Sequence, residues 1–186
     1  MPTLHWAPPP YPLLALALGT GLRFGEILGL LWSNVDLETG TIEVRHRLDE
    51  VSRTLESTKS ESGRRTVALP AAVTNALQDL RKQQLARGPG SRYVFCNRDG
   101  GPLRQNNFAR RVFKPLLERA GILGVHFHDL RHSSATLALA HGVTAKVLQV
   151  RLGHRNIGTT LNIYGHVLPA QDRDAADRLD KVFKAK

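Results

Sequence analysis

The spacing of apolar residues in the first forty positions is mainly that of helices. Four prolines between Pro8 and Pro12 prevent a regular helix before about residue 12. The Leu- and Ala-rich stretch from Pro12 to Leu18 predicts a buried helix that ends before Thr20 and Gly21. A second short helix is predicted over 22–32, where the apolar residues fall on one face.

After Gly40 the pattern changes to short runs in which apolar and polar residues alternate, which is typical of strands. The runs at 41–48 and 65–69 alternate clearly, and the run at 53–57 alternates more weakly. Polar turns that include residues 60–63 separate these runs. The pattern predicts three short strands in one small antiparallel sheet.

The chain after Pro70 is expected to be mostly helical. A brief extended piece at 93–96 and a turn at 97–102 interrupt the helical pattern. The predicted helices cover 71–87, 104–120, 128–141, 144–152, 156–165 and 170–184. The predicted fold class is therefore mainly α with a small three-stranded antiparallel β-sheet.

The length of 186 residues suits one domain. We place that domain at 13–168, between a proline-rich leader at 1–12 and a C-terminal helical tail at 169–186. A composition of 41% hydrophobic and 23% charged residues is that of an ordinary soluble protein. No internal repeat and no glycine fingerprint of a nucleotide-binding loop is found in the sequence.

The longest apolar stretch, Tyr11 to Leu18, is far shorter than the roughly 20 residues of a membrane-spanning helix. The first ten residues lack the basic start and the cleavage site of a signal peptide. The single cysteine, Cys96, excludes an internal disulfide framework and a metal site built from cysteines. These features predict a cytoplasmic protein without a membrane span.

The charge balance gives the first indication of a partner. The chain has 26 Lys and Arg against 16 Asp and Glu, a net charge of +10. A polyanion fits this charge, because neutralising phosphates releases condensed counterions. We therefore expect a nucleic acid as the partner, with anionic lipid or a merely basic surface as the alternatives.

A few polar residues are candidates for binding a phosphodiester. His128 and Arg131 stand three residues apart on one face of a predicted helix, and Arg23 lies at the start of another. Two guanidinium groups form a fork that matches the nonbridging oxygens of a phosphate. Taken singly, Arg23 would be a surface charge, His154 a helix cap and Tyr164 a core residue.

A zinc site is the competing hypothesis for the histidines. His128 and His132 stand four residues apart, a spacing that suits zinc on a helix. Arg131 lies between them and repels a cation, and the sequence between the two histidines contains no Glu. We therefore expect no metal and no other cofactor.

Four motifs in order give these residues a common context. The segments are TGLRFGEILGLLW (20–32), STKSESGRRTVALP (57–70), HFHDLRH (126–132) and LGH…TT…YGHV (152–167). Together they resemble the motifs of the tyrosine recombinases of the phage integrase family. The resemblance runs from residue 20 to about 167 and implies the catalytic-domain fold of that family.

The resemblance implies a site-specific DNA recombinase, integrase-like, that binds double-stranded DNA and cleaves and rejoins its strands through a 3′-phosphotyrosyl intermediate. The implied catalytic residues are Arg23, Lys59, His128, Arg131, His154 and Tyr164. Tyr164 would attack the phosphate, with His128 assisting removal of its proton. Lys59 would protonate the leaving 5′-oxygen, although a solvated turn lysine is the alternative for this residue. The two arginines and His154 would stabilise the transition state, without metal or ATP.

Other polar residues have supporting roles in this hypothesis. Glu26 is expected to orient Arg23, and Asp129 to cap or brace its helix. Contacts with the DNA backbone are expected from a second group of arginines, although those after residue 100 fit a solvated helix face about equally well. This group is Arg64, Arg65, Arg104, Arg110 and Arg111.

Members of the family usually carry a helical DNA-binding domain before the first motif, and a proline-rich stretch stands there in this sequence. A shortened chain, a gene remnant and a protein that works without the usual clamp are the open interpretations. The alternatives to a recombinase are a DNA-binding remnant and a type IB topoisomerase-like relaxing enzyme. The amphipathic segment 172–186, with Leu179 on its apolar face, is expected to exchange between protomers on DNA.

Overall fold

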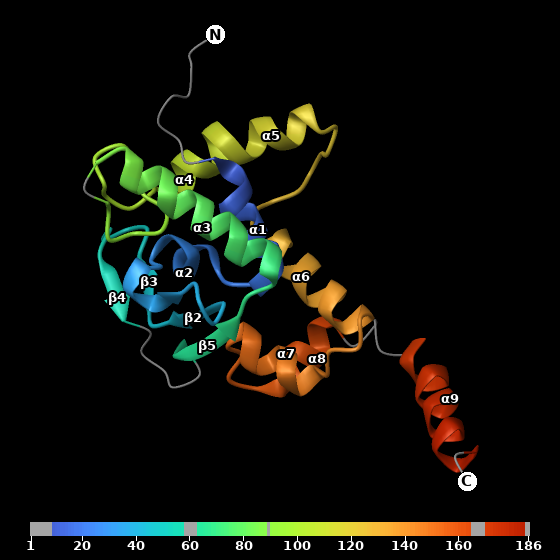
Figure 1. Ribbon diagram of the computed structural model, residues 1–186. Helices are drawn as coiled ribbons and strands as arrows, with labels where there is room; N and C mark the ends of the chain where they lie inside the picture. The colour runs from blue at the N-terminus through green and yellow to red at the C-terminus, as the bar shows by residue number, and fades with distance from the viewer. Residues whose placement is uncertain (1–8, 58–62, 89, 165–169, 185–186) are drawn as a thin grey trace.

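The computed structural model describes residues 9–57, 63–88, 90–164 and 170–184, and Figure 1 shows how they are arranged. The elements in chain order are α1 (Pro10–Thr20), α2 (Phe24–Leu28), a 3₁₀ turn (Trp32–Asn34), β1 (Val35–Asp36), β2 (Thr41–Val44), β3 (His46–Leu48), β4 (Leu55–Ser57), β5 (Arg65–Ala68), α3 (Ala71–Ala86), α4 (Gln105–Phe108), a π-helical segment (Ala109–Phe113), α5 (Lys114–Arg119), α6 (Asp129–Ala140), α7 (Ala145–Leu152), α8 (Ile157–Tyr164) and α9 (Ala170–Lys184). The predicted helices after Pro70 agree with these bounds within a few residues.

The first helix is longer than the sequence pattern predicts. α1 begins at Pro10 because a proline in the first turn of a helix lacks only an N–H that has no helical partner there. The helix continues to Thr20, and Gly21 then ends it in the left-handed conformation, with φ of 67°. Leu13 and Leu16 of this helix are completely buried.

The second helix is shorter than predicted. Only Phe24–Leu28 of the predicted 22–32 segment is α-helical. A Cβ added to Gly29 would lie 2.8 Å from the backbone nitrogen of Leu48, so β3 packs directly against the end of α2. The close approach of the β3–β4 hairpin therefore accompanies the end of the helix before the apolar pattern ends.

The main sheet has three strands, as predicted, but one of them is not among the three predicted strands. β2 lies between β1 and β5 and is antiparallel to both, with Val44 opposite Arg65. The predicted strand 41–48 divides at Arg45 into β2 and β3, and 53–57 contains β4, which pairs with β3 in a separate two-stranded sheet. The assignment of 53–57 to the main sheet was therefore wrong. The strand that was missed is β1, which is too short to alternate.

Two hydrophobic clusters meet where α1 ends. The larger one packs α1, α2 and α3 with the sheet and the aromatic residues near α4. The smaller one joins α6 to α7 through Ala135, Leu139, Leu148 and Leu152. A Cβ added to Gly21 would lie only 2.6 Å from the side chain of Leu152, so this glycine allows the two clusters to touch.

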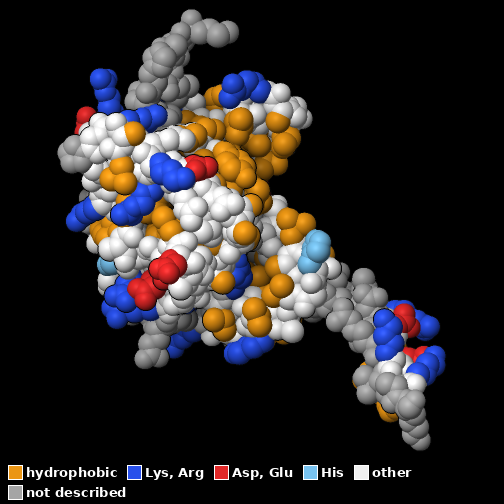
Figure 2. Space-filling view, in the orientation of Figure 1, with side chains coloured by type: hydrophobic (Ala, Val, Ile, Leu, Met, Phe, Trp, Pro, Cys, Tyr) orange, Lys and Arg blue, Asp and Glu red, His pale blue; other side chains and the backbone are white. Residues whose placement is uncertain are grey.

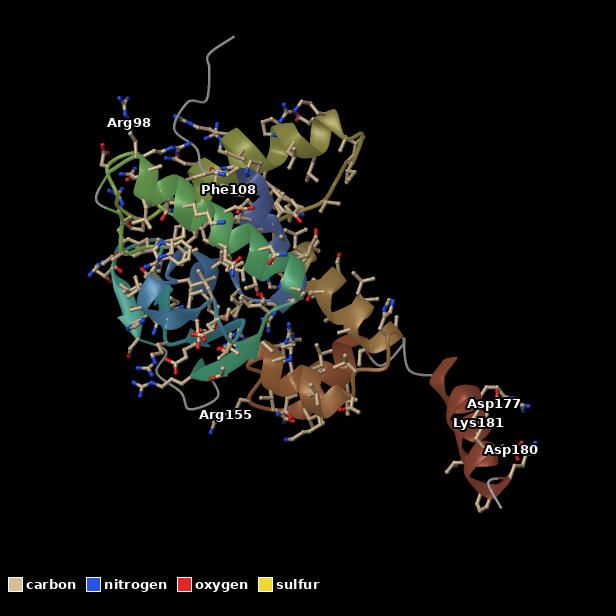
Figure 3. All side chains as sticks on the ribbon, in the orientation of Figure 1. Arg98, Phe108, Arg155, Asp177, Asp180 and Lys181 are labelled. Atoms are coloured by element: carbon tan, nitrogen blue, oxygen red, sulfur yellow. The ribbon has the colours of Figure 1, made fainter. Side chains whose placement is uncertain are left out.

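The last helix stands apart from the rest of the protein in Figure 1. α9 exposes Leu179 and Phe183, which are 58% and 78% exposed. Figure 3 labels Asp177, Asp180 and Lys181 along the same helix, so charged and apolar side chains both extend from it. Within the described ranges, no helix has the length and the apolar character needed to cross a membrane.

Candidate active site

Arg23 stands at the start of α2 and is oriented by the carboxylate of Glu26. The backbone N–H of Arg23 donates to Oε2 of Glu26 at 2.9 Å, and its Nη1 donates to Oε1 at 3.2 Å. Glu26 is buried, whereas the Arg23 side chain is 46% exposed. The charge of Arg23 is therefore held in a defined direction and remains accessible to an anion from solvent. The expectation that Glu26 orients Arg23 agrees with these contacts.

An aromatic stack joins the start of α2 to the start of α6. Phe24 follows Arg23, Phe127 precedes His128, and the two phenyl rings stack with centroids 3.7 Å apart. Phe108 of α4 contacts both rings edge-on, at 5.8 and 6.1 Å. Packing of these apolar neighbours thus brings Arg23 and His128 to the same part of the molecule.

Arg131 on the first turn of α6 is buried and held by main-chain oxygens. Its Nη1 donates to the carbonyl of Gly21 at 2.6 Å, and its Nη2 donates to the carbonyl of Leu152 at 2.9 Å. The same Nη2 lies 2.8 Å from Nε2 of His154. One guanidinium therefore ties the end of α1 and the end of α7 to the histidine that follows α7.

The hydrogen bonds of His154 define its protonation state. Because arginine only donates, Nε2 of His154 accepts from Arg131, and the proton lies on Nδ1. Nδ1 is 2.8 Å from Oγ1 of Thr160 on α8, which is buried. Burial lowers the pKa of His154 to about 4, and the charges of Arg131, Arg23 and Arg65 act in the same direction.

His128 lies beside the same charges. Burial lowers its pKa, and the neighbouring His132 and Arg131 lower it further, with a smaller contribution from Arg23 and an opposing one from Asp129. The His128 and His132 rings are 4.9 Å apart and nearly perpendicular. Asp129 accepts from the backbone N–H of His126 at 2.7 Å, so it braces the start of its helix as expected.

Four of the six predicted catalytic residues therefore lie within one electrostatic neighbourhood: Arg23, His128, Arg131 and His154. Tyr164 is the last residue of α8, four residues after Thr160. Lys59 falls in 58–62, outside the described residues. An excess of positive charge around two neutral imidazoles suits binding of a phosphate.

The arginines predicted to contact DNA separate into two groups. Arg64, Arg104, Arg110 and Arg111 are exposed, and the last three belong to the α4 region that contacts α2. Figure 2 shows Lys and Arg side chains distributed over the visible face of the protein. Arg65 differs, because its side chain is only 3% exposed and pairs with Glu26 at 2.9 Å. This geometry favours a structural role for Arg65 over the predicted backbone contact.

Two contacts within the candidate site were missed from the sequence. Thr160 lies inside the last motif, but nothing in the motif states which of its two threonines points inward. Arg65 carried a usable signal, because it stands two residues from Val67 and alternation places both on the buried face of β5.

Comparison with known proteins identifies the family. The model of the phage integrase family matches residues 10–171, which contain every candidate catalytic residue. The chain belongs to the phage integrase family. The resemblance drawn from the four motifs and the predicted fold class are both confirmed.

The relatives of this integrase-family chain include recombinases and integrases. It is 34% identical over 192 residues to a XerC-like tyrosine recombinase of Caldanaerobacter subterraneus subsp. tengcongensis, covering 92% of this chain and 49% of the relative. It is 29% identical to the ICEBs1 integrase of Bacillus subtilis, covering 90% of this chain and 48% of the relative. The chain thus spans about half the length of the curated relatives that it matches.

Solved structures of similar fold include one bound to DNA. The Tn1549 transposon integrase in complex with circular intermediate DNA superposes with a TM-score of 0.78 at 28% identity, covering 91% of this chain and 59% of that one. XerA recombinase superposes with a TM-score of 0.71 at 27% identity, covering 90% and 57%.

Proposed function

We propose that this chain is the DNA-cleaving and rejoining unit of a site-specific recombinase that acts on double-stranded DNA through a 3′-phosphotyrosyl intermediate. The observation that carries the proposal is the convergence of Arg23, Arg131, His128 and His154 on one site from three separate segments of the chain. Family membership supports the same chemistry.

In the proposed cleavage step, Tyr164 attacks the scissile phosphorus through its phenolic oxygen. The bond to the 5′-oxygen breaks, and Lys59 supplies the proton that converts this oxygen to a hydroxyl. His128 assists removal of the tyrosine proton, and its lowered pKa favours the neutral form that accepts a proton at pH 7. The reverse reaction with a new 5′-hydroxyl rejoins the strand, because the tyrosyl link conserves the phosphodiester energy.

The charge that develops on the phosphate is stabilised by the two arginines in this proposal. Arg23 is accessible and oriented, and Arg131 is buried and fixed by carbonyls, so little reorganisation is needed when the charge develops. We therefore propose that the reaction needs neither a metal ion nor ATP. His154 acts on the site through Arg131 in this arrangement; a direct bond to the phosphate would require Nε2 to exchange partners.

The exposed arginines are proposed to bind the DNA backbone. Arg64, Arg104, Arg110 and Arg111 extend the positive charge beyond the site, and the net charge of +10 agrees with a polyanion partner. We also propose that the protein works in the cytoplasm, where DNA is accessible and Cys96 stays reduced.

Self-association on DNA is proposed to use α9. Exposed Leu179 and Phe183 give this helix an apolar side, and Figure 1 shows α9 standing apart from the other described elements. Exposed apolar residues on α6 and α7, namely Leu137, Val147 and Val150, offer a surface of matching character on a second copy. The helix of one protomer would cover this surface of its neighbour.

Covalent capture on nicked DNA tests the proposed function. A library of duplexes with a randomised core, each nicked so that the cleaved end diffuses away, is incubated with the chain, and protein-linked DNA is recovered and sequenced. We expect adducts with the native chain and none with Tyr164→Phe. Equal capture by both proteins would refute the role of Tyr164.

The same experiment separates the alternatives. DNA binding without any adduct would favour a DNA-binding remnant. Adducts accompanied by relaxation of a supercoiled plasmid that contains no pair of captured sequences would favour topoisomerase-like activity. Exchange of strands between two captured sequences would support the recombinase.

A further inference from the structure

Arg65 on β5 is a buried arginine that contacts three segments of the site at once. Each of the three nitrogens of its guanidinium donates to a protein oxygen. Nη1 and Nη2 donate to the two carboxylate oxygens of Glu26 at 3.0 and 2.9 Å. Nε donates to the carbonyl of Arg151 at 2.8 Å, and Nη1 also donates to the carbonyl of Gly63 at 3.2 Å.

The contact with Glu26 links Arg65 to Arg23. Each carboxylate oxygen of Glu26 that accepts a hydrogen bond from Arg65 also accepts one from Arg23. Oε2 accepts from the backbone N–H of Arg23, and Oε1 accepts from its side chain. Because this carboxylate binds both residues, Arg65 fixes the position of the Glu26 side chain, and Glu26 in turn fixes the position of Arg23. The paired geometry is the bidentate one in which arginine fixes both distance and angle.

The carbonyl contact with Arg151 reaches a further part of the site. Arg151 is followed by Leu152, whose carbonyl accepts from Arg131. The side chain of Arg151 in turn donates to the carbonyl of Gly19 at 2.6 Å, near the end of α1. Arg65 thus lies at the junction of β5, α2 and the end of α7.

We propose that Arg65 is a positioning residue of the strand-transfer reaction. By holding Glu26 and the carbonyl of Arg151 with one guanidinium, it sets the spacing between Arg23 and the Arg131–His154 pair. The inference rests on the proposed function. It assigns to Arg65 no contact with DNA, in contrast to its exposed neighbour Arg64.

The buried carboxylate makes this arrangement sensitive to the loss of Arg65. Burial raises the pKa of Glu26, and the hydrogen bond and charge of Arg65 outweigh it, with a smaller contribution from Arg23, so that the pKa lies below its usual 4.5. Arg65 on β5 and Arg23 on α2 are the charged groups that face this carboxylate among the described residues. Without Arg65 the largest contributions that lower this pKa are lost, so the carboxylate would take up a proton at a higher pH than in the native chain.

The test compares Arg65→Gln with Arg64→Gln, two neighbouring arginines with different expected effects. We expect Arg65→Gln to lower the single-turnover rate of adduct formation at saturating DNA by about 100-fold, the size of effect that a displacement of about 1 Å produces. Its DNA affinity and salt dependence should stay unchanged. Arg64→Gln should weaken binding and reduce the salt dependence. A loss of affinity in Arg65→Gln without a loss of rate would overturn the proposal.

A pH profile separates positioning from a general loss of structure. The cleavage rate of Arg65→Gln should fall as the pH is lowered toward the raised pKa of Glu26, because a protonated carboxyl no longer holds Arg23. Arg65→Lys retains the charge and should restore the native profile with an intermediate rate, which also covers the case in which the glutamine variant fails to fold. An Arg65→Lys protein with the native rate would overturn the proposal.

A readout that needs no catalysis separates this proposal from the proposed function. Hydrogen exchange of the Arg23 guanidinium, followed by NMR in the DNA-free protein, should be faster in Arg65→Lys than in the native chain. If the native chain forms no adduct, the proposed function fails, and the exchange rate still decides whether Arg65 orients Arg23. An unchanged exchange rate would refute the positioning role.

Discussion

The Nε2 atom of His154 lies 2.8 Å from an Nη atom of Arg131, and this contact fixes the imidazole in its neutral form with the proton on Nδ1. The histidine therefore does not compete with the arginine as a second buried cation. It is instead an acceptor that holds the arginine in place, and on the other side of the ring its Nδ1–H donates a hydrogen bond to Oγ1 of Thr160.

The first prediction concerns this second hydrogen bond. Thr160→Val keeps the shape of the side chain and leaves the Nδ1–H of His154 without its partner, at a cost of about 1–3 kcal/mol. We expect the rate of adduct formation to fall roughly tenfold at saturating DNA. Thr159→Val is the matched control, because Thr159 is exposed. Equal rates in the two variants would show that the hydrogen bond has no part in catalysis.

The second prediction concerns stability at low pH. Since the pKa of His154 falls from 6.5 to about 4 on folding, the unfolded chain binds a proton between these values and the folded chain does not. Above pH 6.5 neither state binds this proton, so the free energy of unfolding does not depend on the titration of His154 there. As the pH falls from 6.5 toward 4, proton binding to the unfolded chain lowers the free energy of unfolding. Urea unfolding of the native chain and of His154→Gln should give curves whose difference changes across this range. A constant difference would contradict the prediction.

The third prediction concerns the glycine where the two hydrophobic clusters meet. Gly21 and Gly121 have similar left-handed backbones, with φ of 67° and 70°. An added Cβ meets Leu152 at 2.6 Å at Gly21 and nothing within 4 Å at Gly121. Gly121→Ala should therefore cost about 1–2 kcal/mol for the backbone alone. Gly21→Ala should cost about 1–3 kcal/mol more from crowding, measured by urea unfolding.

The fourth prediction concerns the arginines of the α4 region. Replacing Arg104, Arg110 and Arg111 with Ala should reduce the slope of log affinity against log salt by up to about 3, because each phosphate contact contributes about 0.9. Replacing the same residues with Lys should retain most of the slope. A titration of duplex DNA at several salt concentrations measures both. An unchanged slope in the Ala variant would mean that these residues merely solvate the helix.

The fifth prediction concerns α9. Leu179 and Phe183 are exposed, so replacing both with Ser should leave the melting temperature of the DNA-free chain nearly unchanged. Assembly of two or more protomers on DNA should weaken, as measured by sedimentation. Lys181→Ser, a change at an exposed charged position of the same helix, is the control. Normal assembly by the double variant would exclude exchange of this helix.

The helices after Pro70 and the set of site residues were largely predictable from sequence, for different reasons. The helices follow from local periodicity, which contacts elsewhere in the chain reinforce. The convergence of Arg23, His128, Arg131 and His154 followed from motifs in a recognisable order, because spacing alone does not state that residues more than 100 positions apart meet.

The contacts that were not predicted depend on tertiary packing. The end of α2 coincides with the approach of the β3 backbone to Gly29, a contact that no local pattern encodes. The contacts of Arg65 depend on a carboxylate 39 residues away and on the direction in which β5 faces. A charged residue beside another arginine suggests an exposed position. Only its alternation with Val67 along β5 indicates that the Arg65 side chain is buried.

The guanidinium of Arg131 is held by the carbonyl oxygens of Gly21 and Leu152. Because these oxygens belong to the peptide backbone, every amino acid substituted at either position still presents one. An alanine scan around Arg131 would therefore leave both acceptors in place and understate how firmly the group is anchored. A substitution at either position acts on this anchor only where it shifts the path of the main chain, as Gly21→Ala would by crowding the side chain of Leu152.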